Sequence, residues 1–121
     1  MGVAATYDLG FALAMLLFPV SASRRLGLPP PDDPTYLGLA GLLILVLAGM
    51  YALAAADVVR HQGIVRVAIA GRTLGALYLG RAALTHPRSP AFVATALIDL
   101  GFAVAHAVLL TRALRRSDAS S

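Results

Sequence analysis

Cysteine, tryptophan, lysine and glutamate are all absent from this chain of 121 residues. Without cysteine, the protein cannot form disulfides, use a thiol as a nucleophile or carry the CxxC redox motif of quinone-coupled four-helix proteins. Charge is scarce as well, because only 13% of the residues are charged, whereas a soluble domain carries about 25%. The ten basic residues are all arginine, they are scattered along the chain, and the net charge is only +4. The sequence therefore predicts neither a water-soluble domain nor a nucleic-acid-binding surface.

Long apolar segments fill most of the chain. Hydrophobic residues make up 59% of the sequence, and the mean hydropathy is +0.78. This composition predicts an all-α integral membrane protein, a four-helix bundle whose helices run up-down-up-down across the bilayer. The four transmembrane helices are expected at about residues 3–20, 36–56, 64–85 and 91–111. They form a single four-helix transmembrane domain at 1–112, and a polar C-terminal tail follows at 113–121.

The segment at 36–56 is the clearest membrane span, because it contains no charged residue. Its length matches the roughly 20 apolar residues that a helix needs to cross a bilayer. Ala48 and Ala52 are four residues apart, on a ridge of small side chains that favours close helix packing. These two alanines are therefore predicted to contact a neighbouring helix.

The segment at 3–20 is long enough to span a bilayer only if Tyr7 and Asp8 are included. It would then cover roughly 27 Å at 1.5 Å per residue. The stretch at 21–35 contains Pro-Pro-Pro and Asp-Asp-Pro, and the stretch at 86–90 is also bounded by proline. Proline cannot continue a helix, so both stretches are predicted to be non-helical links.

Four spans place both termini on the same side of the membrane. Arginine counts are nearly equal on the two sides, with a small excess on the side of the termini that favours a cytoplasmic location for both. The expected location is the cell (inner) membrane, as a multi-pass protein. The last predicted helix is followed by three arginines suited to anionic headgroups, Arg112, Arg115 and Arg116.

One arginine lies near the middle of a predicted span. Arg72 is at the centre of 64–85, where an arginine costs roughly 2.5–3.5 kcal/mol to insert, so it should face the bundle interior and a partner. Gly71 and Gly75 bracket it and are predicted to let helices pack closely. The remaining helices are therefore expected to supply acceptors for Arg72.

Helix rise predicts which polar residues share its depth. Counted from the side of the termini, Asp8, Tyr51 and His106 lie at roughly 8 Å, Arg72 at about 12 Å and Asp99 at about 18 Å. Asp99 and His106 are seven residues apart and share a helix face. The predicted polar core or ligand-binding site thus combines residues from all four helices, with the choice of carboxylate for Arg72 left open.

Each member of this group also has a plainer interpretation. Arg72 and a carboxylate can form an ion pair that only fixes helix register, or one that contacts a ligand. Asp8 can sit at the membrane interface in the first helical turn. His106 can be a buried polar residue rather than a proton relay, and Tyr51 can belong to an interfacial aromatic belt.

The search for catalytic and metal-binding motifs gives nothing. The chain has no phosphate-binding glycine loop, no HExxH and no GxSxG sequence. Its three histidines are too far apart to form a helical pair, so no metal site and no cofactor are predicted. Catalytic residues remain unassigned.

Short motifs along nearly the whole chain resemble small bacterial four-helix membrane proteins of the DoxX-like kind, most of them uncharacterised. The motifs are Phe18-Pro19, Arg25-Leu26-Gly27-Leu28-Pro29, Tyr51 with Asp57, Gly71-Arg72-Thr73-Leu74-Gly75 and Leu97-Ile98-Asp99-Leu100. The resemblance implies an integral membrane four-helix bundle. Some relatives are associated with quinone-linked thiosulfate oxidation, so a quinone is implied by the resemblance alone. No cysteine or metal motif in this chain supports that redox role.

Three functions are compatible with these residues. The first is a non-enzymatic binding or assembly module whose Arg/Asp centre holds a lipid-like or quinone-like molecule, a second copy of the chain or another membrane protein. The second is a small membrane enzyme that uses Asp99 or Asp8 for acid–base chemistry on an apolar substrate. The third is a dimeric proton-coupled exporter. We rank them in this order.

Overall fold

The computed structural model describes residues 1–85 and 90–119, and these form helices joined by short links. The helices are α1 (Gly2–Leu17), α2 (Pro19–Arg25), α3 (Thr35–Ala56), α4 (Gln62–Thr85) and α5 (Pro90–Ala119). The described ranges contain no β-strand. The all-α class is thus confirmed. The predicted turn at 86–90 lies outside the described residues, apart from Pro90, which begins α5.

Three helices are long and apolar enough to cross a membrane, α3, α4 and α5. The first predicted span is wrong as a single helix, because α1 ends at Leu17 and the chain bends by 120° into α2. Pro19 explains the break. It lacks an amide hydrogen and its ring disfavours helical geometry at the residue before it, and Phe18 accordingly has φ −134° and ψ 57°. Among the described residues, α1 and α2 pass the same test only when taken as a pair, which makes them either a broken span or a re-entrant loop.

The short helix α2 occupies part of the region predicted as a non-helical link. It ends at Gly27, whose φ of 71° is left-handed and suits glycine. The amide of Gly27 donates to the carbonyl of Arg24, and the amide of Leu28 donates to the carbonyl of Ser23. This pair of bonds is a Schellman motif. It turns the chain so that the segment after α2 runs back toward α3.

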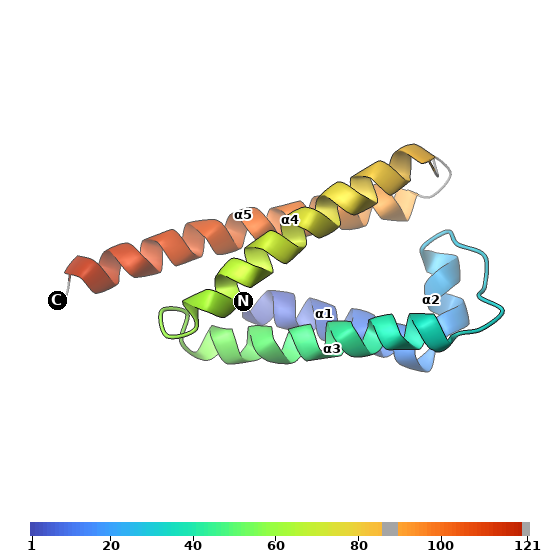
Figure 1. Cartoon of the computed structure of the whole chain (residues 1–121), viewed down its shortest axis with the longest axis horizontal. Helices are drawn as coiled ribbons and strands as arrows, with labels where there is room; N and C mark the ends of the chain where they lie inside the picture. The colour runs from blue at the N-terminus through green and yellow to red at the C-terminus, as the bar shows by residue number, and fades with distance from the viewer. Residues whose placement is uncertain (86–89, 120–121) are drawn as a thin grey trace.

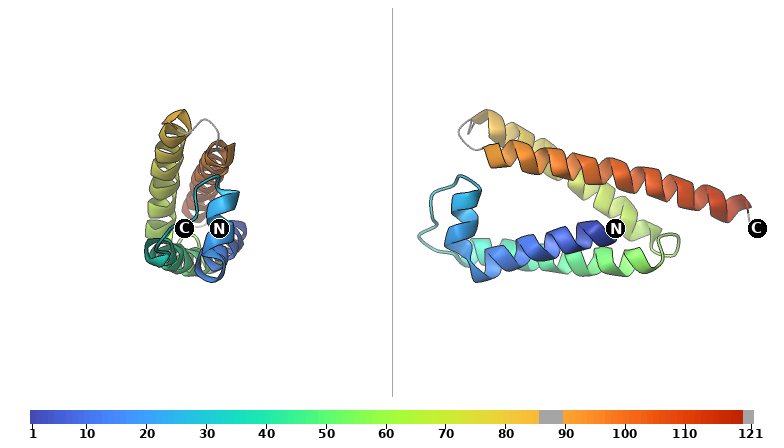
Figure 2. Two further views of the ribbon diagram at one scale, coloured as in Figure 1. Left: turned by 90° about the vertical axis from the view of Figure 1, so that its right-hand side faces the viewer. Right: turned by 180° about the vertical axis from the view of Figure 1, so that it is seen from behind.

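The long helices form two antiparallel pairs that diverge like the arms of a V (Figures 1 and 2). In one arm α1 packs along α3, and in the other α4 packs along α5. The arms meet where α3 turns into α4, and both termini point toward this closed end (Figure 1). Successive long helices therefore alternate in direction, as predicted. The two pairs, however, pack together only at the closed end of the V (Figure 1).

The core lies at the closed end of the V. Residues from all four long helices are buried there in two neighbouring clusters, which include Ala4, Tyr51, Ala68, Val65 and Leu110. Most of the buried side chains are small, which lets the helix backbones approach closely. Many leucines and valines instead point outward and are exposed. Such a surface suits a lipid environment rather than water.

Close packing in the α1–α3 arm depends on Gly41. A Cβ built on Gly41 would lie 3.0 Å from Leu16 Cγ and 3.2 Å from the carbonyl oxygen of Ala12. Ala48 is buried on the same helix, as predicted. Ala52 is exposed, so its predicted packing role within the chain is wrong. The contact face of α3 is rotated away from the predicted ridge.

The last helix is longer than predicted, since α5 continues past Thr111 to Ala119. At 1.5 Å per residue its 30 residues cover roughly 45 Å. That exceeds the roughly 30 Å of a bilayer core. Residues 113–119 of the predicted polar tail are therefore helical, and alanine, leucine and arginine, all good helix formers, occupy most of this last part. Residues 120–121 lie outside the described chain.

A local cap at the start of α3 gives a prediction about pH. The Asp33 carboxylate accepts hydrogen bonds from the Thr35 amide at 2.9 Å and from the Thr35 hydroxyl at 2.6 Å. These bonds favour the ionised form and lower the pKa of Asp33 below its ordinary value of 3.8. The cap is intact above the ordinary pKa and is lost as the pH falls through the lowered one. In a carbon-13 NMR titration, Thr35→Val should raise the Asp33 midpoint only part of the way to 3.8, because the amide still donates. An unchanged midpoint would contradict the role of the hydroxyl.

Candidate functional site

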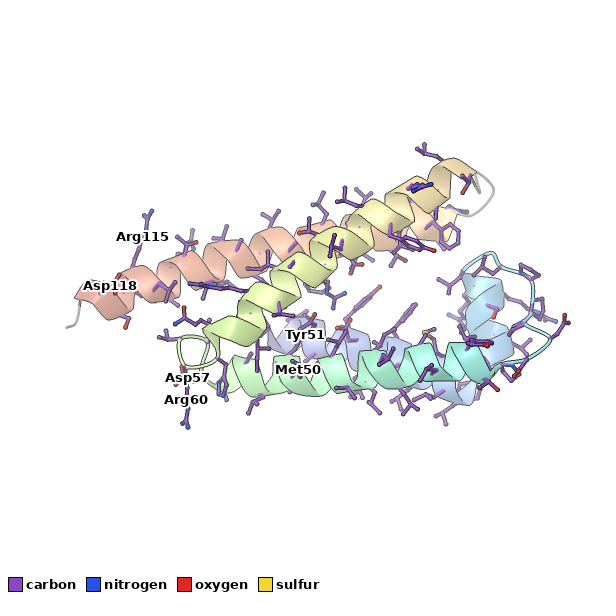
Figure 3. All side chains as sticks on the ribbon, viewed as in Figure 1. Met50, Tyr51, Asp57, Arg60, Arg115 and Asp118 are labelled. Carbon is purple, nitrogen blue, oxygen red and sulfur yellow. The ribbon has the colours of Figure 1, made fainter. Side chains whose placement is uncertain are left out.

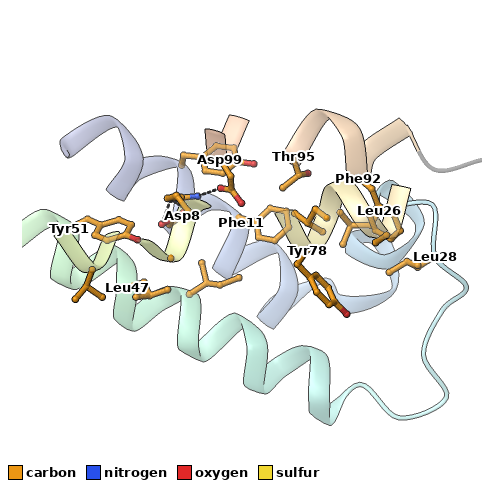
Figure 4. Close-up of a pocket in the computed structure, with 17 residues that line it drawn as sticks. Asp8, Phe11, Leu26, Leu28, Leu47, Tyr51, Tyr78, Phe92, Thr95 and Asp99 are labelled. Atoms are coloured by element: carbon orange, nitrogen blue, oxygen red, sulfur yellow. Dashed lines mark hydrogen bonds and ion pairs between the residues drawn. The ribbon is translucent and has the colours of Figure 1, made fainter. Parts of the chain in front are cut away.

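A buried arginine joins the two arms of the V. Arg72 on α4 donates from Nη2 to both oxygens of Asp8 on α1 and from Nη1 to Oδ1 of Asp99 on α5, with all three distances 2.5 Å (Figure 4). The exposed fractions of the three side chains are only 10%, 6% and 11%. Asp8 is therefore buried within the protein, and its carboxylate lies beyond the first turn of α1. The open question of which carboxylate pairs with Arg72 has a clear answer, since both do.

Aromatic rings surround the guanidinium. Its central carbon lies 5.1 Å from the ring centroid of Phe102, 5.6 Å from that of Tyr51 and 5.9 Å from that of Tyr7. A cation within about 6 Å of an aromatic ring is attracted to the ring face, most strongly where water is excluded. The rings belong to α5, α3 and α1, so every long helix contributes to the surroundings of Arg72. This arrangement fixes the guanidinium from several sides.

His106 lies behind these rings rather than within the ion-pair network. It is 2% exposed and stacks on Phe102, with ring centroids 5.9 Å apart. Tyr51 approaches it edge-on at 6.2 Å. Its Nδ1 has no hydrogen-bond partner among the described residues. His106 thus contacts two of the rings around Arg72, but no bond in the described chain links His106 to the ion pairs.

Gly75 has a different role from the one predicted. A Cβ built there would lie 2.9 Å from Asp99 Oδ2, so the missing side chain gives the carboxylate room beside α4. A Cβ on Gly71 would meet nothing within 4 Å, so the predicted packing role of Gly71 is wrong for contacts within the chain. Gly75 thus leaves room for the carboxylate of Asp99, whereas Gly71 has free space beside its backbone.

This difference gives a matched pair of substitutions. Gly71→Ala should be neutral or stabilise by up to about 1 kcal/mol, because alanine is the better helix former. Gly75→Ala gains the same helix propensity, but its Cβ displaces the Asp99 carboxylate. We therefore expect the Gly75→Ala variant to be about 1–2 kcal/mol less stable than the Gly71→Ala variant. Unfolding in detergent by circular dichroism measures both. Equal stability of the two variants would contradict the close approach of Gly75 to Asp99.

A cleft of about 660 Å³ opens between the arms, next to the ion pairs (Figure 4). Residues of α1, α3, α4 and α5 and of the link after α2 line it, and most of them are apolar or aromatic. The polar ones are Asp8, Asp99 and Arg72, together with the hydroxyl-bearing Thr95 and the tyrosines. The lining residues include Tyr7, Phe11, Leu26, Leu28, Ile44, Leu47, Tyr51, Tyr78, Leu79, Phe92 and Thr95. The cleft thus combines an apolar wall with one cluster of charge.

The charge of this cluster is unbalanced. Two carboxylates face one guanidinium, so full ionisation would leave one net negative charge in a site with little water. Nη1 and Nη2 are already engaged by carboxylates, and Nε has no partner among the described residues. No group of three or more potential metal-ligating side chains occurs in the parts of the chain that the structure describes.

Sequence reasoning missed the contributions of Phe102 and of the segment after α2 to the site. Phe102 is three residues after Asp99 and four before His106, a spacing that already places it on the same helix face. Leu26 and Leu28 line the cleft because α2 folds back. Their place could not be inferred while that region was predicted as a link.

Comparisons with known proteins add no relative. No protein-family model matches this chain, and searches of curated proteins and of solved structures find no significant match. The resemblance to DoxX-like proteins therefore stays a prediction based on short motifs. The functional argument depends on the geometry of the cleft and its ion pairs.

Proposed function

We propose that the protein crosses the bacterial inner membrane four times, with both termini in the cytoplasm. Three long apolar helices and many outward-facing leucines and valines support membrane insertion. In this proposal α1 provides the fourth crossing, and α2 lies near the opposite interface after the bend at Phe18. The 16 residues of α1 cover roughly 24 Å, most of a bilayer core. The tight packing of α1 on α3 supports its placement in the membrane.

We further propose that the protein is a non-enzymatic binding module, whose cleft holds a flat, carbonyl-bearing ring with an apolar tail, such as a quinone-like molecule. The observation that carries this proposal is an apolar and aromatic cleft with one charged cluster on its wall. Ligand sites typically have this composition, in which a few polar groups orient the ligand. Five aromatic residues line the cleft, Tyr7, Phe11, Tyr51, Tyr78 and Phe92. Aromatic walls favour a flat ring over a flexible acyl chain.

The ion pairs support binding rather than catalysis. Arg72 binds both carboxylates, so neither Asp8 nor Asp99 is a free general base. The two carboxylates belong to different helices, Asp8 to α1 and Asp99 to α5, so their bonds to Arg72 fix the shape and charge of the cleft wall. An arrangement of this kind can orient a ligand without changing protonation state.

A second candidate function follows from the excess of carboxylates. Two aspartates share one arginine, so a proton or a cationic ligand would neutralise the site. This observation favours a proton-coupled exporter as the alternative. In liposomes with an internal pH dye, an exporter should release protons when a hydrophobic cation is added. The binding module should release none.

The absence of tryptophan allows a sharp test of ligand binding. Tyr78→Trp places a single fluorophore on the cleft wall, and Tyr36→Trp places one on the exposed start of α3 as a matched control. A benzoquinone with a ten-carbon tail quenches tryptophan on contact. In nanodiscs we expect saturable quenching at position 78 and only linear, collisional quenching at position 36.

A third variant separates binding from partition into the lipid. Gly71 lines the cleft, and a Cβ there would meet nothing within 4 Å, so Gly71→Leu should narrow the cleft. In the Tyr78→Trp background it should abolish the saturable phase and leave the fold intact. Linear quenching at both positions would contradict the quinone-like ligand. Saturable quenching at position 78 by a brominated phospholipid alone would assign the cleft to a lipid.

A further inference from the structure

A second cavity, a groove of about 290 Å³, lies at the closed end of the V and shares no lining residue with the cleft. One side is a face of α5, formed by His106, Leu109, Ala113 and Arg116, whose spacing of three and four residues places them in line. Arg112 adds a second guanidinium. The opposite side is formed by Met1, Val58 and Val65. The cavity therefore has apolar walls and a cationic end.

The cavity combines two independent features of a ligand site. His106 is 2% exposed and forms part of the wall, and its Nδ1 has no hydrogen-bond partner among the described residues. A buried polar nitrogen without a partner is costly unless another group satisfies it. Arg112 and Arg116 are one helical turn apart near the end of α5, where they face the same cavity. The imidazole of His106 and the guanidinium groups of Arg112 and Arg116 thus line the same groove.

The order of these groups along α5 matches the order of groups in a membrane phospholipid. From His106 to Arg116 the helix rises roughly 15 Å, from the buried core toward the end that extends beyond the bilayer. Guanidinium groups bind phosphate oxygens through paired hydrogen bonds. The glycerol ester groups lie deeper than the phosphate, which corresponds to the inner end of the groove, where His106 forms part of the wall. Val58, Val65 and Leu109 form the apolar walls of the groove beside these groups.

We propose that this groove binds the phosphate headgroup of an anionic phospholipid, held by Arg112 and Arg116 with His106 at its inner end. Basic pockets between membrane helices on the cytoplasmic side are known to bind anionic headgroups. The inference rests on the proposed membrane insertion and on the proposed cytoplasmic side for the termini. It does not depend on occupancy of the cleft, which the quenching assay reports separately.

Native mass spectrometry of the detergent-solubilised full chain tests the site. Protein is incubated with equal amounts of dioleoyl-phosphatidylglycerol and dioleoyl-phosphatidylcholine, and the retained lipid is counted. The native chain should retain one phosphatidylglycerol with a preference of roughly tenfold to thirtyfold, the effect expected of two arginines. The double variant R112Q/R116Q should lose that preference.

Two further variants separate the groove from general surface charge. R60Q/R115Q removes the same charge from two exposed arginines whose side chains project away from the helix pairs (Figure 3), and it should keep the preference. Ala113→Leu narrows the groove without changing charge and should reduce retention at least several-fold. Equal loss in R60Q/R115Q, or full retention in Ala113→Leu, would overturn the proposal.

Inorganic phosphate distinguishes the lipid from a free anion. Millimolar phosphate should leave the retained phosphatidylglycerol unchanged, because it lacks the acyl chains that contact the apolar walls. Displacement of the lipid by phosphate at that concentration would assign the groove to a soluble anion instead and would contradict the proposal. If the protein retains phosphatidylglycerol but shows no saturable quenching, the lipid site in the groove is supported. Only the proposal of a quinone-like ligand in the cleft is then contradicted.

Discussion

Arg72→Leu is expected to destabilise the protein by about 3–5 kcal/mol, the cost of leaving buried charges without their partner. Asp8 and Asp99 would remain in the interior without the guanidinium that binds them both. The arms of the V would also lose the side chain that connects α1 to α5 through α4. Unfolding in a mixed detergent, followed by circular dichroism, measures the effect. Arg81→Leu on the same helix removes an exposed arginine and should change stability by less than about 1 kcal/mol.

A compensating variant shows whether Arg72 stabilises the protein by balancing the aspartate charges or by its side-chain contacts. The triple variant D8N/R72L/D99N removes all three charges and keeps side chains of similar size at positions 8 and 99. Replacing a complete buried ion network is often neutral, whereas breaking it is costly. We therefore expect the triple variant to recover most of the stability lost in Arg72→Leu. A triple variant no more stable than Arg72→Leu would contradict charge balance and would show that the lost contacts of the guanidinium dominate. Recovery of stability without saturable quinone quenching would assign the charges to ligand binding.

Gly41→Leu should cost about 1–3 kcal/mol by forcing α1 away from α3. A Cβ alone already lies within 3.2 Å of backbone on α1, and the longer side chain has no room in the interface. Gly49→Leu is the matched control on the same helix, because a Cβ there meets nothing within 4 Å. We expect the control to be as stable as the native chain or more so, since leucine is the better helix former. Equal destabilisation of both variants in the same unfolding assay would contradict the placement of α1.

The polar centre could be predicted from the sequence because charge in an apolar segment has few alternatives. Arg72 needs acceptors, and helix rise limits which carboxylates share its depth. That argument gave Asp8 and Asp99 and predicted the proximity of Tyr51 and His106. It could not choose between the two carboxylates, because their depths differ from that of Arg72 by similar amounts. One guanidinium satisfies both because its two terminal nitrogens point in different directions.

The helix contacts could not be predicted in the same way. Residues 36–56 are apolar on every face, so the sequence carries no amphipathic signal for the rotation of α3 about its axis. That is why Ala52 was predicted in the interface and Gly41 was missed. The break at Phe18 was visible in Pro19, but hydropathy alone extended the helix through it. The divergence of the arms depends on packing between pairs, for which a single sequence holds no marker.

The central claim is that Arg72 is neutralised within the membrane by carboxylates from α1 and α5 together. Solid-state NMR in lipid bilayers tests it most directly, with nitrogen-15 in the arginine guanidinium groups and carbon-13 in the aspartate carboxyl groups. We predict two strong nitrogen–carbon dipolar couplings to Arg72, one lost in D8N and the other in D99N. A guanidinium of Arg72 coupled to lipid phosphate, or to neither aspartate, would contradict the account.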